Sequence, residues 1–214
     1  GKSIIDLLRL LSTCGSSASK ANAKTLSTLK TLEGEKRRLV MMLCCCEDLA
    51  FVEAMVPHLV RCLQDKSWSM RFRAIDALAK LRDGAFRKQL PAILERLNDE
   101  DECPRQSAVR SLTQLSPHEL KGHVSMLTRT LDDPDDTVQY EVMKLCSKGL
   151  DPTTLDSLMP KLLEKLTSSS AESVVLALSR LSPDAIRKHA AAFVSVLQGL
   201  ADWVKSDVLR ALQE

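Results

Sequence analysis

The chain has 214 residues, of which 44% are apolar and 3% aromatic, and its 30 basic and 28 acidic side chains leave a net charge of +2. This balance argues against the strongly basic surface of a nucleic-acid-binding protein. No apolar run approaches the ~20 residues that a membrane-spanning helix needs, so we expect no membrane span.

The first predicted element is an apolar helix within residues 1–19. It contains Ile4, Ile5, Leu7, Leu8 and Leu11, and a loop rich in glycine and serine follows at residues 15–19. We expect it to form a single N-terminal capping helix.

Residues 20–150 contain a regular repeat. Leu29, Leu63, Leu97 and Leu131 stand 34 residues apart, and we call them the ladder leucines, position 0 of each unit. Mostly apolar residues recur at positions −7, −3, +11 and +15, which are the spacings of amphipathic helices. A short polar stretch, such as residues 64–67 or 98–101, separates the two helical stripes of each unit. Each unit is therefore predicted to be a helical hairpin, and a repeat of this length indicates stacked units.

The repeat continues less regularly over residues 151–214, where Leu166 and Leu197 follow at spacings of 35 and 31 residues. The chain stops shortly after Leu212, which suggests a piece of a longer protein. We expect one domain over residues 1–214, an all-α, right-handed α-solenoid of about six helical hairpins with an N-terminal capping helix.

Helix starts are also visible. The stretch Ser116-Pro117-His118-Glu119 has the pattern of a capping box with proline at the first helical position. Asp151-Pro152 and Ser182-Pro183 share the cap-then-proline arrangement, and Asp133-Pro134 is expected to start a second helix.

One combination of residues in these units resembles a known family. Prolines stand six residues before three ladder positions, inside the predicted first helices: Pro57, Pro91 and Pro160. An acidic turn follows, and arginines stand eight residues after three ladder leucines: Arg37, Arg71 and Arg105. This order resembles the HEAT repeat, in particular its short HEAT-like variety, over roughly residues 20–214. The pattern departs at Gln139, Val174 and Lys205, where an arginine would fall. The resemblance implies a scaffold, because HEAT repeats share no active site.

The three arginines admit two interpretations. They could form a ladder that grips phosphates or an acidic partner. Alternatively, each could pair with a turn carboxylate such as Asp65, Asp99 or Asp133 and tie one unit to the next. We favour this second, structural ladder.

A candidate binding surface lies on the second helices. With positions +11 and +15 buried, positions +9, +13 and +17 should face outward, and the family resemblance implies that second helices line the concave side of the array. We call these positions the second-helix strip: Phe72, Asp76, Lys80, Gln106, Arg110, Gln114, Tyr140, Lys144 and Lys148. The simpler interpretation is ordinary solvated surface. The alternative is a groove for an acidic peptide or helix of a partner protein, with Phe72 and Tyr140 as anchors.

The remaining chemistry is sparse. Cys44, Cys45 and Cys46 are consecutive on one predicted helix, so their side chains diverge and cannot chelate one metal ion. Cys44 and Cys146 occupy the buried position +15. Seven cysteines used in this way indicate an intracellular reducing compartment, such as the cytoplasm, the nucleus or an organelle matrix or stroma. Structural or surface roles are expected for the four histidines, which are His58, His118, His123 and His189. Trp68 and Trp203 are expected to pack between turns.

The leading functional hypothesis is a non-catalytic interaction scaffold or adaptor, or an accessory subunit of a larger assembly, with no metal, cofactor or catalytic residue. Two alternatives come from other HEAT-like proteins. A DNA glycosylase would need a strongly basic concave face, which the near-neutral charge opposes. A bilin lyase would share only the repeats, since no residue here carries that chemistry.

Overall fold

The computed structural model describes residues 40, 49–165, 178, 180–199 and 202–211. Every regular element in these ranges is a helix, which confirms the all-α prediction. The predicted capping helix and Arg37 lie outside the described residues. The chain divides into two compact units, residues 1–111 and residues 112–214. None of the described helices has the length and apolar character needed to cross a membrane.

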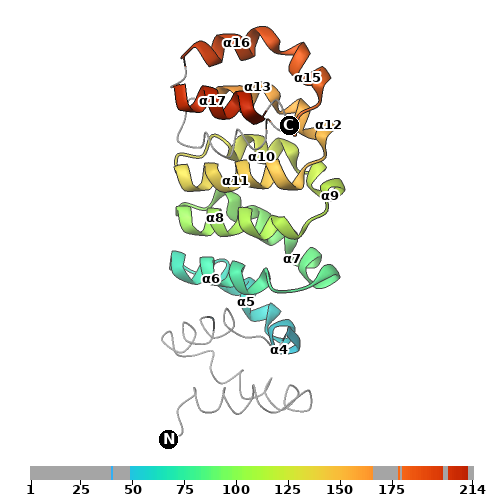
Figure 1. Ribbon diagram of the computed structural model, residues 1–214. Coiled ribbons are helices and arrows are strands. Elements are labelled where there is room, and N and C mark those ends of the chain that lie inside the picture. Colours follow the sequence, from blue (N-terminus) through green and yellow to red (C-terminus); the bar gives the residue numbers. More distant parts are fainter. Residues whose placement is uncertain (1–39, 41–48, 166–177, 179, 200–201, 212–214) are drawn as a thin grey trace, which may run out of the picture. The chain divides into compact units, whose positions relative to one another are not determined.

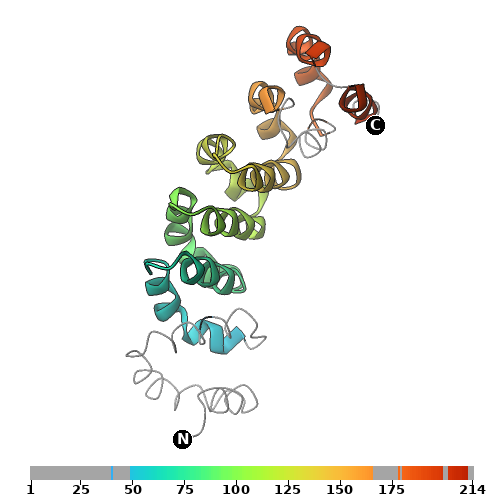
Figure 2. The ribbon, with the colours of Figure 1, turned by 90° about the vertical axis from the view of Figure 1, so that its left-hand side faces the viewer.

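Unit 1 is built from helical hairpins (Figure 1). Its elements are α4 (Leu49–Ala54), α5 (Val56–Cys62), α6 (Trp68–Leu78), α7 (Asp83–Glu95), the 3-10 turn η2 (Arg96–Asn98) and α8 (Glu102–Ser111). Helix α6 packs chiefly on α8, and Figure 2 shows α5 and α7 in one layer and α6 and α8 in the other. The first helices of successive hairpins therefore lie in one layer, and the second helices, α6 and α8, stack on each other in the other layer.

Unit 2 repeats this pattern. Its elements are η3 (Leu112–Gln114), α9 (Pro117–Lys121), α10 (Val124–Thr130), α11 (Asp136–Gly149), α12 (Pro152–Ser157), α13 (Met159–Lys165), α15 (Pro183–Lys188), α16 (Ala190–Gly199) and α17 (Asp202–Ala211). Helices α10 and α11 pack together as one hairpin, and α13 packs on α16 of the following one.

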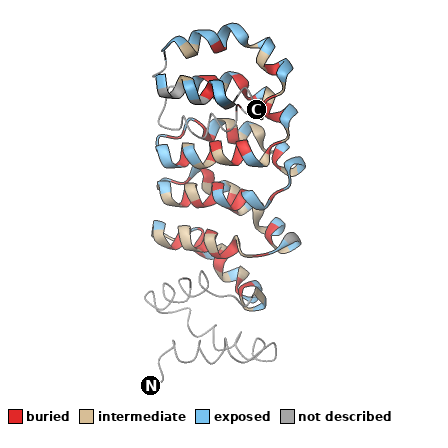
Figure 3. Cartoon of the chain, in the orientation of Figure 1, coloured by how far each residue is buried: buried red, intermediate tan, exposed pale blue. Residues whose placement is uncertain are grey.

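The core follows the predicted repeat. The ladder leucines Leu63, Leu97 and Leu131 are at most 4% exposed. All described members of positions +11 and +15 up to Cys146 are fully buried: Val40, Ala74, Ala108, Val142, Leu78, Leu112 and Cys146. Figure 3 shows the buried residues as stripes along helices such as α6, α8 and α11. Small and aliphatic side chains therefore fill the space between helices, which explains the low aromatic content.

The first helices are less continuous than predicted. Pro57 and Pro160 each occupy the second position of a new short helix, α5 and α13, so the prolines follow a break instead of lying inside one helix. Only Pro91 remains inside an unbroken helix, α7. Proline lacks the N–H that a helix interior uses, and a break just before it removes that loss. A similar break at Gly122 and His123, between α9 and α10, has no proline.

The predicted helix caps are confirmed at three places. Ser116 and Glu119 form the reciprocal capping box of α9. The side chains of Asp151 and Ser182 accept backbone hydrogen bonds at the starts of α12 and α15. The prediction that Asp133-Pro134 starts a helix is wrong by two residues, because Asp135 is the cap and α11 begins at Asp136. The carboxylate of Asp133 instead accepts a hydrogen bond from the backbone N–H of Asp135.

Candidate partner-binding surface

An aspartate at position +2 organises the turn inside three of the hairpins. The carboxylates of Asp65, Asp99 and Asp133 accept hydrogen bonds from the backbone N–H groups two residues later, at 2.9, 3.1 and 2.9 Å. Their backbone carbonyls accept from the side chain at position +8, which is Arg71 at 2.9 Å, Arg105 at 2.8 Å and Gln139 at 2.7 Å. Gln139 thus fills the place of the missing arginine, because an amide N–H can donate this bond as well.

Arg71 does more than close its own turn. Its Nε and Nη2 atoms donate to the two carboxylate oxygens of Asp99 in the next hairpin, at 2.8 and 2.7 Å. Nη2 also donates to Asp101 at 2.8 Å. The side chains of Arg71 and Asp99 are only 5% and 1% exposed. This is the geometry expected of an arginine that ties one unit to the next. Arg105 donates hydrogen bonds to the backbone carbonyls of Asp99 and Glu100 in its own turn, at 2.8 and 3.2 Å.

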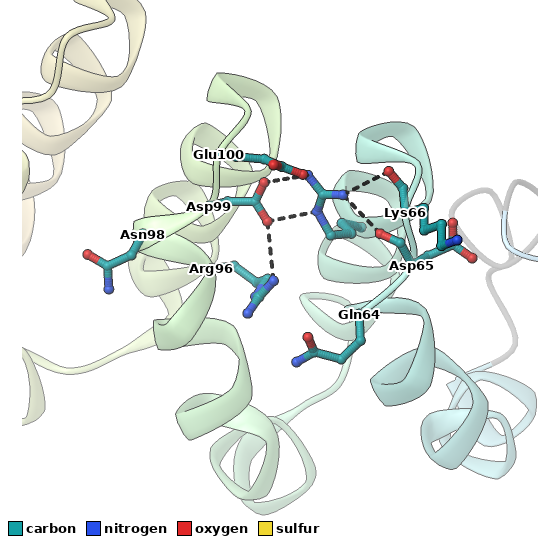
Figure 4. Close-up of a pocket in the computed structure, with 8 residues that line it drawn as sticks. Gln64, Asp65, Lys66, Arg96, Asn98, Asp99 and Glu100 are labelled. Carbon is teal, nitrogen blue, oxygen red and sulfur yellow. Dashed lines mark hydrogen bonds and ion pairs between the residues drawn. The ribbon is translucent and has the colours of Figure 1, made fainter.

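A polar pocket of about 380 Å³ lies beside this ion pair. Figure 4 shows Asp65 and Lys66 on one side and Asp99 and Glu100 on the other, so two successive turns of unit 1 form its walls. Arg96 donates to the carbonyl of Leu63 at 3.2 Å and to Asp99 at 3.4 Å. The acidic and basic side chains that line the pocket are equal in number, so their charges cancel. The guanidinium groups of Arg71 and Arg96 point towards carboxylates and backbone carbonyls. We interpret the pocket as part of the joint between hairpins.

The ion pair sets the ionisation of Asp99. Burial opposes its charged form, but hydrogen bonds from Arg71 and from the N–H of Asp101, together with the charges of Arg71 and Arg96, outweigh burial and lower its pKa. The unfolded chain therefore binds a proton at this site before the folded chain does, and stability falls as the pH drops through the folded pKa.

This predicts a pH-dependent effect of Asp99→Asn. At pH 7 the variant should be less stable than the wild type, because the ionic bond to Arg71 is lost. Below about pH 4 the difference should begin to shrink, because the unfolded wild-type chain takes up a proton at Asp99 first, and it should vanish as the pH falls through the lower pKa of the folded carboxylate. Urea unfolding at pH 7 and pH 3 measures both free energies, with exposed Asp184→Asn as the control. A difference that stays constant across this pH range would contradict the assignment.

Within unit 1 the second-helix strip is only partly open. Arg110 is exposed, whereas Phe72, Asp76, Lys80 and Gln106 are half-buried. Asp76 accepts a hydrogen bond from the hydroxyl of Ser107 at 2.5 Å, so it fastens α6 to α8. The carboxylate is therefore engaged in the stacking of two hairpins.

Within unit 2 the strip includes Gln114, which is exposed, and three residues of α11. Tyr140, Lys144 and Lys148 are spaced by four residues and share one face of this helix, and we call them the α11 stripe. Tyr140 is 40% exposed, and the ammonium of Lys144 lies 5.9 Å from the centre of its ring, within range of a cation–π interaction. Glu141 lies 3.8 Å from the same ammonium, and Lys148 is exposed one turn further on.

The tryptophans and cysteines singled out in the sequence have the following environments. Trp68 is 46% exposed at the start of α6, so the expectation that it packs between turns is wrong. The side chain of Trp203 and residues Cys44–Cys46 lie outside the description. Cys146 is fully buried, and burial raises the pKa of its thiol to about 12. The thiol therefore stays neutral and packs as an apolar side chain. Among the described residues, no three histidine, cysteine or acidic side chains gather in a way that could hold a metal ion.

Unit 2 also contains contacts between hairpins that the sequence analysis missed. Lys161 and Lys165 bind Asp132 at 2.7 and 3.1 Å. Arg180 donates to the carbonyls of Ser147 and Leu150 at the end of α11. Asp156 accepts from the backbone N–H of Ser182 at 3.0 Å and from its hydroxyl at 2.6 Å, which holds the cap of α15. Polar side chains thus join successive hairpins of unit 2, as Arg71 does in unit 1.

Comparison with known proteins supports the repeat. Residues 25–113 match the family described as HEAT repeats, as the sequence resemblance predicts. No curated protein matches the chain.

Three solved structures are similar in fold. One is an engineered protein from the Northeast Structural Genomics Consortium, with a TM-score of 0.59 and 22% identity over 90% of this chain and 95% of that chain. A designed armadillo repeat protein has a TM-score of 0.59 and 17% identity over 86% of this chain and 94% of its own. A second designed armadillo repeat protein, solved in complex with the peptide (KR)4, has a TM-score of 0.58 and 17% identity over 85% of this chain and 92% of its own. At these identities the likeness shows the fold alone, and it confirms the predicted solenoid class of helical repeats.

Proposed function

We propose that this chain, whose residues 25–113 are HEAT repeats, is a non-catalytic scaffold that binds an acidic peptide or helix of a partner protein along the second-helix strip. HEAT and armadillo repeats commonly mediate protein interactions, and this supports the general class of function. The proposal extends this class to a surface and to the charge of the partner.

The observation that carries the proposal is the α11 stripe. An exposed tyrosine with a lysine ammonium over its ring and a second lysine one turn further on offers a flat apolar surface beside positive charge. Tyrosine can bury a large area with little loss of conformational entropy, and the neighbouring cations can pair with carboxylates. Both kinds of contact suit an acidic helix with an occasional apolar residue.

The charge of the strip supports an acidic partner. Its cations are Lys80, Arg110, Lys144 and Lys148, and its one carboxylate, Asp76, is engaged by Ser107. One similar designed armadillo protein was solved with the basic peptide (KR)4, and that peptide has the opposite charge from the partner proposed here. Complementary charges steer association and select partners, and they do so more than they raise affinity.

We further propose that the scaffold works in an intracellular reducing compartment. The free thiols of Cys62 and Cys146 are buried in the helical core, and that of Cys103 is half-exposed. Cys62 and Cys146 act as small apolar residues, a use that suits a compartment where thiols stay reduced.

Two labelled peptides of equal length, (Asp-Glu)4 and (Lys-Arg)4, provide the test. We expect the wild-type chain to bind the acidic peptide more tightly in a fluorescence anisotropy titration. The double variant Lys144→Glu with Lys148→Glu should weaken that binding by about tenfold or more, and added salt should weaken the wild-type binding.

The matched control is Arg187→Glu with Lys188→Glu, which makes the same charge change at exposed positions of α15. It should leave the affinity for the acidic peptide near the wild-type value. Equal loss in both double variants would mean that only net charge matters, and a preference for (Lys-Arg)4 would reject an acidic partner.

A further inference from the structure

Asp136 shares a face of α11 with the α11 stripe and has the opposite charge. It begins the helix four residues before Tyr140, and it is exposed. Along this face the side chains therefore change from a carboxylate at the start of α11, through a tyrosine ring that is 40% exposed, to the ammonium groups of Lys144 and Lys148 near its end. A partner that lies along α11 meets opposite charges at the two ends of the helix.

Helix α8 in unit 1 has the same order of charges. Glu102 begins this helix, Gln106 follows one turn later, and Arg110 lies in the last turn. Acidic first turns and basic last turns stabilise helices through the helix dipole, and this effect accounts for the order on α8. On α11 the charged ends also flank an exposed aromatic ring, which can bury apolar area against a partner, whereas Gln106 is half-buried and polar. The combination on α11 is therefore suited to binding.

The order of charges on α11 favours one direction for a helical partner. A partner helix that runs antiparallel to α11 places its first turn beside Lys144 and Lys148 and its last turn beside Asp136. Any helix is stabilised by acidic residues in its first turn and basic residues in its last turn. An antiparallel partner can therefore satisfy its own dipole and the charges of α11 with the same residues. A parallel partner would need basic residues in its first turn and acidic residues in its last turn, where they destabilise it.

We propose that the partner segment is an amphipathic helix that lies antiparallel along α11. Its first turn is acidic, an apolar residue in its middle lies on Tyr140, and a basic residue in its last turn pairs with Asp136. Asp136 and Lys148 are 12 residues apart, about 18 Å along the helix axis, so the charged ends of the partner are separated by about three turns. This proposal rests on the proposed function, since it specifies the charge order and the direction of the partner at the same surface.

Two helical peptides that differ at one position provide the probe. Both are alanine-rich, about four turns long and blocked at their ends, which removes the terminal charges. The dipolar peptide has two glutamates in its first turn, a leucine in its middle and a lysine in its last turn. The acidic peptide has a glutamate in place of that lysine.

We expect the wild type to bind the dipolar peptide about threefold to tenfold more tightly than the acidic peptide in fluorescence anisotropy, and Asp136→Lys to reverse this preference. The reversal is the decisive result, because the lysine also stabilises the free peptide helix. The matched control is Asp184→Lys, which makes the same charge change in the exposed first turn of α15 and should keep the wild-type preference. Circular dichroism checks that both variants fold.

A spin label at the N-terminus of the dipolar peptide measures the direction of binding. It should broaden the amide signals of residues near Lys148 more than those near Asp136. An unchanged preference in Asp136→Lys, or broadening mainly near Asp136, would overturn the proposal. If neither peptide binds although (Asp-Glu)4 does, the helical partner is wrong. If the double variant Lys144→Glu with Lys148→Glu leaves every affinity unchanged, the proposed function itself is wrong.

Discussion

Arg71→Ala is expected to lower the free energy of unfolding of unit 1 by about 3–5 kcal/mol. The substitution removes both hydrogen bonds that Arg71 donates to Asp99, and it leaves a carboxylate that is 1% exposed without its main cation. It also frees the carbonyl of Asp65 in the preceding turn. The contacts of Arg71 with exposed Glu100 and half-exposed Asp101 contribute little, because water screens them. Almost the whole effect should therefore come from the buried pair.

Two controls separate this pair from a general effect of lost charge. Arg71→Lys retains the charge but cannot make both bonds to Asp99, so its loss should be intermediate. Arg82→Ala removes an exposed arginine and should change stability by less than about 0.5 kcal/mol. Hydrogen exchange resolved by peptide measures unit 1 separately, which is needed because repeat proteins need not unfold in one step. A loss for Arg71→Ala no larger than that for Arg82→Ala would show that the pair does not hold the hairpins together.

Gly149→Ala is expected to destabilise unit 2 by about 1–3 kcal/mol. A Cβ atom at Gly149, the last residue of α11, would lie 2.7 Å from Cδ1 of Leu120 in α9. Leu120 is fully buried, so its side chain has little room to move away. In an open helix the same change stabilises, since alanine favours helix by about 1 kcal/mol over glycine. We therefore expect Gly149→Ala to lower the free energy of unfolding, whereas helix propensity alone predicts that it rises.

Gly84 provides the matched control for this reversal. It lies in the first turn of α7, and nothing stands within 4 Å of a Cβ atom built there. Gly84→Ala should therefore leave stability unchanged or raise it by a few tenths of a kcal/mol, roughly as helix propensity requires. Adding Leu120→Ala to Gly149→Ala should cost less than the sum of the two single changes, because the small side chain removes the clash. Thermal unfolding followed by circular dichroism measures all four variants. Stabilisation by Gly149→Ala would contradict the close approach of α9 and α11.

The parts of the fold that could be predicted are those that depend on spacing along the chain. Burial of Ala74 and Leu78 follows from helical periodicity once Leu63 is taken as the reference, and the capping box at Ser116 depends on residues three apart. The breaks in the first helices could not be placed, because whether a proline sits inside a helix or just after a break depends on packing from neighbouring helices. Pro91 and Pro57 have the same spacing from their ladder leucines but different environments.

The polar contacts between hairpins show the same limit. Asp156 and Ser182 are 26 residues apart, and Lys161 and Asp132 are 29 apart, so no local pattern marks them as partners. Gln139 departs from the arginine pattern, yet its amide donates the same bond to the turn carbonyl. Sequence reasoning follows residue types, whereas the structure requires only a donor of suitable reach.

The most direct test of the scaffold proposal is co-purification followed by mass spectrometry with three forms of the chain. These are the wild type, Lys144→Glu with Lys148→Glu, and the control Arg187→Glu with Lys188→Glu, after equal helicity and melting have been verified. We expect at least one protein enriched by the wild type and by the control to be lost from the α11 stripe variant. If every protein that co-purifies with the wild type also co-purifies with that variant, the α11 stripe does not bind the partner.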